Sequence, residues 1–95
     1  MDQSKSHERR VIHFRGHVQG VGFRYTAVRI GAGFDVSGFV QNLADGRVRL
    51  VAEGDPEELN CFVDELVAQM AAYIHEVQAD TEPATGEFDD FDIRH

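Results

Sequence analysis

The sequence GHVQGVGFRY, residues 16–25, is the stretch from which the rest of the chain can be interpreted. Three of its first seven residues are glycine, which is incompatible with a regular helix or strand throughout and predicts a shaped loop. Before it the side chains alternate, because Ile12 and Phe14 fall on one face of an extended chain and His13 falls on the other. This alternation predicts a half-buried strand over residues 9–18.

A helix is predicted after the loop, over residues 23–34, because apolar side chains recur there at helical spacing. These side chains are Phe23, Ala27, Ile30 and Phe34. Gly31 and Gly33 weaken the helix, since each glycine costs about 1 kcal/mol relative to alanine. Asp35 is expected to take the left-handed conformation that ends the helix, because aspartate tolerates it better than most residues do.

The next segment predicts a β-hairpin. Residues 36–42 and 48–53 are expected to be its two strands, and the dipeptide Asp45-Gly46 between them is typical of a tight hairpin turn.

A second helix is predicted to begin at Pro56, because Asp55 is a favourable N-cap and proline is preferred at the first helical position. Its apolar side chains also recur at helical spacing, and we expect them in the core. They are Leu59, Phe62, Val63, Leu66 and Met70. Residues 74–81 predict a further strand, residues 82–87 a loop, and residues 88–94 a short last strand.

This order of elements is β-α-β-β-α-β with a short fifth strand. It favours an α+β fold of the ferredoxin-like class, the split β-α-β sandwich, with an antiparallel sheet of four to five strands and two helices on one face. In that arrangement the first two strands run parallel and the third lies between them. Many unrelated activities share this fold, so the fold alone assigns no function.

The length and composition describe one small domain. The chain has 95 residues and a mass of 10.6 kDa, which suits a single core. Residues 1–8 predict a flexible N-terminal tail, and residues 9–95 the folded domain. No apolar run approaches the ~20 residues of a membrane span, and no signal peptide is visible. The single cysteine, Cys61, excludes an internal disulfide. We therefore expect a cytoplasmic monomer.

The charge is spread unevenly along the chain. The net charge of −8 argues against a general nucleic-acid binder, whose domain would be basic. Residues 1–30 nevertheless contain six basic and two acidic side chains, whereas residues 31–95 contain three basic and fifteen acidic ones. The basic first third could therefore hold a small anion, because nearby groups dominate at close range.

Two polar residues are expected at one edge of the predicted sheet. Arg24 lies in the first turn of the first helix, where the glycine loop and the helix N-terminus also present backbone N–H groups to an anion. Asn42 ends the second strand, about 10 Å away across one intervening strand. Each residue also has a simpler interpretation, since Arg24 could be a surface charge and Asn42 could stabilise the following turn.

Taken together, these residues resemble the acylphosphatase family. Residues 16–25 are similar to that family's phosphate loop, and the sequence GFVQN, residues 38–42, resembles its second motif. Residues 85–88 and 91–94 resemble the family's usual C-terminal segment, so the similarity runs from about residue 11 to residue 94. Two departures are Phe39, where tryptophan is usual, and Gln41, where a basic residue is frequent.

The resemblance implies hydrolysis of the carboxyl-phosphate bond of small acyl phosphates to a carboxylate and inorganic phosphate. It matches the family's catalytic arginine and asparagine to Arg24 and Asn42. We expect Arg24 to bind the phosphoryl group and Asn42 to position the attacking water. The backbone N–H groups expected to bind substrate are those of Gln19, Gly20, Val21, Gly22 and Phe23. No metal, cofactor, nucleic acid or membrane is expected as a partner.

Other interpretations stay open at this point. The chain could bind phosphate without turnover, as a sensor or as one domain of a larger carbamoyl-transferring enzyme, although its end at residue 95 favours a free-standing enzyme. Binding of single-stranded RNA on the open sheet face would need paired aromatics and a basic surface. The five histidines lack metal-ligand spacing. His17, in the loop, could be a further substrate contact.

Overall fold

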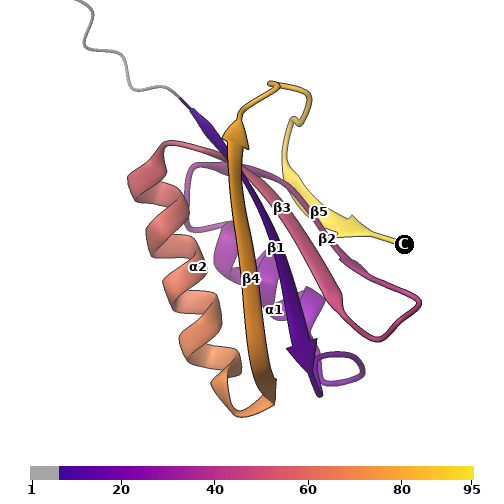
Figure 1. Cartoon of the computed structure of the whole chain (residues 1–95). Helices are drawn as coiled ribbons and strands as arrows, with labels where there is room; N and C mark the ends of the chain where they lie inside the picture. Colours follow the sequence, from indigo (N-terminus) through magenta and orange to yellow (C-terminus); the bar gives the residue numbers. More distant parts are fainter. Residues whose placement is uncertain (1–6) are drawn as a thin grey trace, which may run out of the picture.

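Five strands form one sheet, in the order β4-β1-β3-β2-β5 (Figure 1). The computed structural model describes residues 7–95. Its elements are β1 (Glu8–Gly16), α1 (Phe23–Gly31), β2 (Val36–Asn42), β3 (Val48–Gly54), α2 (Pro56–Met70), a 3₁₀ turn (Ala71–Tyr73), β4 (Ile74–Pro83) and β5 (Phe91–Arg94). The tail predicted over residues 1–8 lies outside the described residues up to position 6, and Glu8 already belongs to β1.

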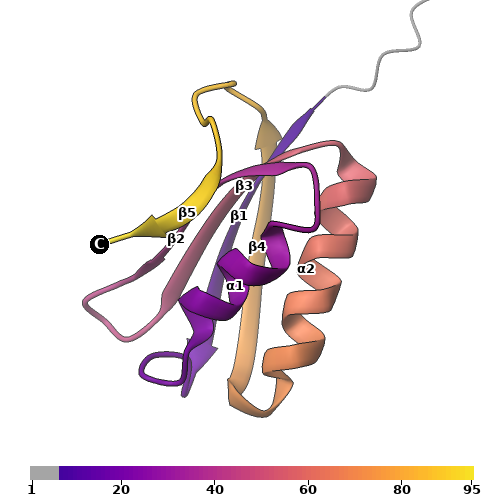
Figure 2. The same cartoon turned by 180° about the vertical axis from the view of Figure 1, so that it is seen from behind.

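The sheet brings the ends of β1 and β2 to one edge. β3 lies between them and pairs antiparallel with both, so β1 and β2 run parallel, as predicted. Phe14 near the end of β1 lies opposite Val48, and Val48 lies opposite Asn42 at the end of β2. The loop after β1 and the turn after β2 therefore leave the same edge of the sheet (Figure 2).

The predicted ferredoxin-like class is confirmed, but the sheet is not wholly antiparallel. β5 pairs with β2 in parallel, with Val40 opposite Ile93, which makes the sheet mixed. A segment of four residues carries no hairpin signal that would place it beside a particular strand, so the sequence pattern could not reveal this pairing.

Both helices pack on the same face of the sheet (Figure 2), and the main core lies between these two layers. Of the apolar stripe predicted in α2, Leu59, Phe62 and Leu66 are fully buried there. The opposite face is covered by neither helix and carries a smaller apolar cluster of Val11, Phe39, Val51 and Phe88. Within residues 7–95, neither helix combines the length and the apolar character that crossing a membrane requires.

The first helix is shorter than predicted. It ends at Gly31 instead of residue 34, and the chain leaves it through a tighter turn, in which the Gly33 N–H donates to the Ile30 carbonyl at 2.9 Å. The expected left-handed conformation of Asp35 is wrong, because no non-glycine residue in the described range has a positive φ. The Asp35 N–H instead donates to the Glu58 carboxylate at 2.8 Å.

Two strands are also shorter than predicted. β1 ends at Gly16, two residues early, because the chain turns there into the glycine loop. β5 begins at Phe91 instead of residue 88. Phe88 precedes the strand and packs its ring against Phe39 on the open face, with ring centroids 5.8 Å apart.

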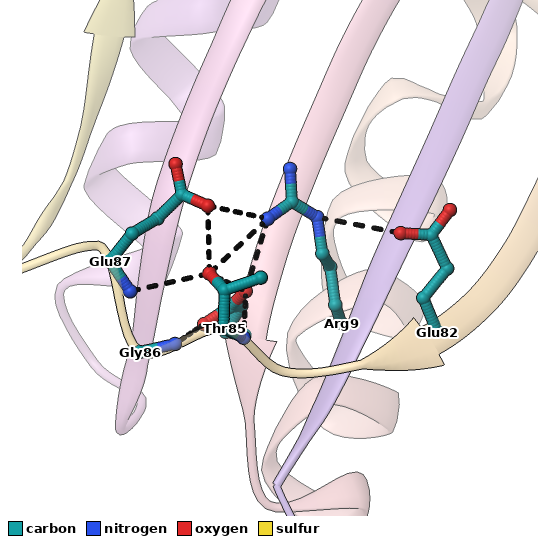
Figure 3. Close-up of polar contacts among 6 residues, drawn as sticks. Arg9, Glu82, Thr85, Gly86 and Glu87 are labelled. Carbon is teal, nitrogen blue, oxygen red and sulfur yellow. Dashed lines mark hydrogen bonds and ion pairs between the residues drawn. The ribbon is translucent and has the colours of Figure 1, made fainter.

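A buried carboxylate fastens the segment between β4 and β5 to the sheet, and Figure 3 labels its partners Arg9, Thr85 and Gly86. Glu53 is only 4% exposed and accepts hydrogen bonds from the Thr85 N–H, the Thr85 hydroxyl and the Gly86 N–H at 2.9–3.0 Å. Arg9 lies 3.3 Å from the same carboxylate. Burial acts to raise the pKa of Glu53, but the Thr85 and Gly86 hydrogen bonds and the Arg9 charge outweigh it and hold the pKa below its usual value of 4.5.

We expect Glu53→Gln to lower the free energy of unfolding by about 2 kcal/mol at neutral pH, because hydrogen bonds to a charged group are lost. Since the native pKa is depressed, the carboxylate contributes fully above its unfolded value of 4.5, and the contribution disappears as the pH falls through the native pKa. The difference between variant and wild type should therefore shrink in acid. Urea unfolding at about pH 7 and about pH 3 measures it.

The matched control for this prediction is Glu76→Gln, because Glu76 is exposed and its ion pair with Arg15 is long, at 3.9 Å. Exposed pairs contribute little to stability, so this variant should unfold like the wild type. Equal stability of Glu53→Gln and wild type at neutral pH would show that the Glu53 network does not stabilise the fold.

Candidate active site

The loop between β1 and α1 is shaped by two glycines in the left-handed region. Gly20 has φ 78° and Gly22 has φ 79°, a conformation that costs other residues free energy. Between them and β1, the Val18 side chain is fully buried in the core and anchors the loop. The glycine spacing seen in the sequence therefore serves a real backbone requirement.

No side chain of the described residues caps the start of α1, and no carboxylate offsets the positive end of its dipole there. Gly22 is its N-cap and offers no side chain, and the first turn contains no acidic residue. The first hydrogen bond within the helix runs from the Thr26 N–H to the Gly22 carbonyl at 2.9 Å. The N–H groups that precede Thr26 in this turn have no helical acceptor, so they can receive an anion at the positive end of the helix.

The second helix shows the opposite arrangement. Asp55 caps α2 by accepting from the Glu57 N–H at 3.1 Å, and both Glu57 and Glu58 lie in its first turn. Carboxylates of the chain thus occupy the positive end of α2. No carboxylate takes the corresponding place in the cap or the first turn of α1.

Arg24 and Asn42, which are far apart in the sequence, line the same hollow of about 260 Å³. Its wall combines backbone of the glycine loop, the first turn of α1, the end of β2 and one side chain of β5. The lining residues are Val18, Gly20, Gly22, Phe23, Arg24, Tyr25, Asn42 and Ile93. The β1–α1 loop and the end of β2, which contribute to this lining, lie at the same edge of the sheet (Figure 2).

Arg24 and Asn42 both carry hydrogen-bonding groups that have no partner within residues 7–95. Arg24 forms no hydrogen bond or ion pair with any residue in the range 7–95. The Asn42 Oδ1 atom is buried, and no hydrogen-bond partner for it exists among the described residues. Buried acceptors normally have a hydrogen-bond partner, so the Asn42 Oδ1 atom can accept from a water or a ligand in the hollow that Arg24 also lines.

The predicted binding residues divide into two groups. Gly20, Gly22 and Phe23 line the hollow together with Arg24 and Asn42, and their binding of substrate stays a prediction. Gln19 and Val21 do not line it. The Gln19 side chain faces the β2–β3 hairpin instead, and Val21 is half-buried against the core.

Sequence reasoning missed three lining residues, Val18, Tyr25 and Ile93. Val18 reads as part of a strand and Ile93 belongs to β5, whose position could not be predicted. Tyr25 lies directly after Arg24 and is 74% exposed at the hollow. An aromatic residue directly after a candidate ligand-binding arginine is the one sequence signal that could have identified it.

Among the described residues, neither His17 nor a cluster of possible metal ligands is located at this hollow. His17 is exposed and does not line the hollow, and its ring packs against His75 with centroids 5.9 Å apart. Across residues 7–95, no group of three or more His, Cys, Asp or Glu side chains is placed to hold a metal ion.

Known proteins match this chain over nearly its whole length. Residues 10–93 match the family model described as acylphosphatase. An acylphosphatase from Geobacter sulfurreducens is 40% identical over 92 residues, which cover 92% of this chain and 97% of that protein. An acylphosphatase from Listeria welshimeri is 48% identical over 54 residues, so the match spans 58% of the length of that relative.

The fold is matched as well. The solved structure of an acylphosphatase from Coxiella burnetii superposes with a TM-score of 0.82 at 28% identity, and it covers 99% of this chain and 100% of its own. These matches confirm the predicted family and fold, and they support acyl phosphate hydrolysis. The chain therefore belongs to the acylphosphatase family of hydrolases.

Proposed function

We propose that this chain hydrolyses small acyl phosphates, with Arg24 and the N–H groups of the glycine loop holding the phosphoryl oxygens. The observation that carries the proposal is that one hollow is lined by a guanidinium and an amide oxygen that both have no partner within residues 7–95. The planar guanidinium of Arg24 can donate to two phosphoryl oxygens at once. Backbone donors at the start of α1 stabilise the remaining charge.

In this mechanism Asn42 directs the water. Its Oδ1 accepts a hydrogen bond from a water molecule and holds it in line with the phosphorus atom and the leaving oxygen. The water oxygen bonds to phosphorus, the bond from phosphorus to the carboxylate oxygen breaks, and a proton of the water passes to a phosphoryl oxygen. The products are a carboxylate and inorganic phosphate.

The chemistry requires neither a general acid nor an enzyme nucleophile. The leaving carboxylate has a conjugate acid with a pKa of about 4, so it departs unprotonated at neutral pH. The only cysteine, Cys61, lies on α2 and does not line the hollow. Positioning and charge stabilisation supply the rate, as is general for phosphoryl transfer.

We also place this activity in the cytoplasm and in a monomer. One free, exposed cysteine suits a reducing compartment. The two side chains with proposed roles, Arg24 and Asn42, both belong to the same chain, so these roles do not require a second copy.

The decisive experiment is a steady-state assay of the purified chain on acetyl phosphate and benzoyl phosphate, with inorganic phosphate as competitor. We expect turnover of both substrates and competitive inhibition by phosphate. A chain that binds phosphate but releases no carboxylate from either substrate would be a phosphate-binding module, and the proposed activity would be wrong.

A further inference from the structure

Gln19, within the glycine loop, uses its side chain to hold the β2–β3 hairpin. Its Nε2 donates to the Leu43 carbonyl at 2.8 Å and to the Arg47 carbonyl at 3.0 Å. Both N–H groups of the amide are therefore engaged with backbone, across 24 and 28 positions of the sequence. Because the partners are so far apart in the sequence, this contact joins segments that no local structure would bring together.

The two carbonyls that Gln19 binds are the two ends of the hairpin connection. The Leu43 N–H donates to the Arg47 carbonyl at 2.8 Å, and the Gly46 N–H donates to the Leu43 carbonyl at 3.1 Å, so these atoms already close the turn. Leu43 directly follows Asn42. The amide of Gln19 thus holds the backbone of the residue that directly follows Asn42, at the end of β2 where the Asn42 side chain lines the hollow.

The Gln19 hydrogen bonds connect the two segments that the proposed mechanism uses, the glycine loop and β2. The glycine loop and Arg24 hold the phosphoryl group, and Asn42 on β2 holds the water. In-line attack requires the water to be placed correctly relative to the phosphorus atom, and a displacement of about 1 Å costs about a hundredfold in rate. The rate of the reaction should therefore depend on the distance between the glycine loop and β2.

We propose that Gln19 is a positioning residue that sets the Asn42-bound water against the phosphoryl group, without contacting either. This inference rests on the proposed function, because it assigns Gln19 a part in the same reaction. It predicts a defect in kcat with little change in phosphate affinity, since the phosphoryl donors lie on the loop and at the start of α1.

The test is Gln19→Glu, which keeps the length of the side chain but replaces the donor with a carboxylate that both carbonyls repel. We expect kcat on benzoyl phosphate to fall by about tenfold or more, while the inhibition constant of inorganic phosphate changes by less than about threefold. Gln19→Met serves as a second variant, because it removes the donor without adding charge. A merely structural role would instead lower the Tm and weaken phosphate inhibition together.

The matched control is Gln78→Glu, the same substitution on the exposed strand β4, which should leave kcat unchanged. Wild-type kcat in both folded Gln19 variants would overturn the inference while leaving the proposed function intact. A parallel loss of phosphate affinity and kcat would also overturn it, because Gln19 would then shape the phosphoryl site itself. Absence of turnover in the wild type would instead refute the proposed function.

Discussion

Arg24→Ala is expected to lose both phosphate binding and turnover, with kcat/KM on benzoyl phosphate lower by at least about a thousandfold. An arginine that stabilises charge in phosphoryl transfer contributes about 10³–10⁵ in rate. Arg24 is the one cationic side chain among the residues that line the hollow. Its removal takes away both the charge and the two-pronged geometry, so the ground state and the transition state lose stabilisation together.

Two further variants separate these contributions. Arg24→Lys keeps the charge but replaces the planar fork with a point donor, so it should recover part of the phosphate affinity and little of kcat. Arg29→Ala is the matched control, because Arg29 lies on the same helix but is exposed and donates to Gln69 at 2.8 Å. Near-normal phosphate inhibition in Arg24→Ala would mean that another group binds the phosphoryl oxygens.

The parts of the site that could be predicted from the sequence are those with local signals. The glycines of the loop, the bare start of α1 and the end of β2 each depend on a few neighbouring residues. The split β-α-β order then places Arg24 and Asn42 at one edge by topology alone, since β1 and β2 must run parallel around β3. Element order and local chemistry were sufficient for this step.

The parts that could not be predicted depend on contacts between distant segments. The Gln19 amide reads as one more polar group in a loop, and its acceptors are backbone carbonyls, which have no sequence signature. Ile93 reaches the hollow because β5 pairs with β2 in parallel, a pairing that strand periodicity does not specify. Residue patterns thus identify candidate groups, and long-range register decides which of them reach the site.

Asn42→Ala should give a different kinetic result from Arg24→Ala. We expect kcat to fall by about 10²–10³, the usual loss when one positioned hydrogen-bonding group is removed, while inhibition by inorganic phosphate stays within about twofold of wild type. The reason is that, in the proposed mechanism, Asn42 contacts the water and not the phosphoryl oxygens. Gln41→Ala is the matched control, because Gln41 precedes Asn42 on β2 and its side chain points to the opposite face of the sheet.

The stability of Asn42→Ala gives a second test. The result expected here differs from the result expected if Asn42 only stabilised the turn. Asn42 Oδ1 has no hydrogen-bond partner among residues 7–95, so Asn42→Ala breaks no hydrogen bond that this atom makes within the described chain. The substitution should therefore leave the Tm nearly unchanged while kcat falls. If Asn42→Ala lowered the Tm and kept near-normal turnover, Asn42 would be a turn-stabilising residue, and the water would have to be directed by another group.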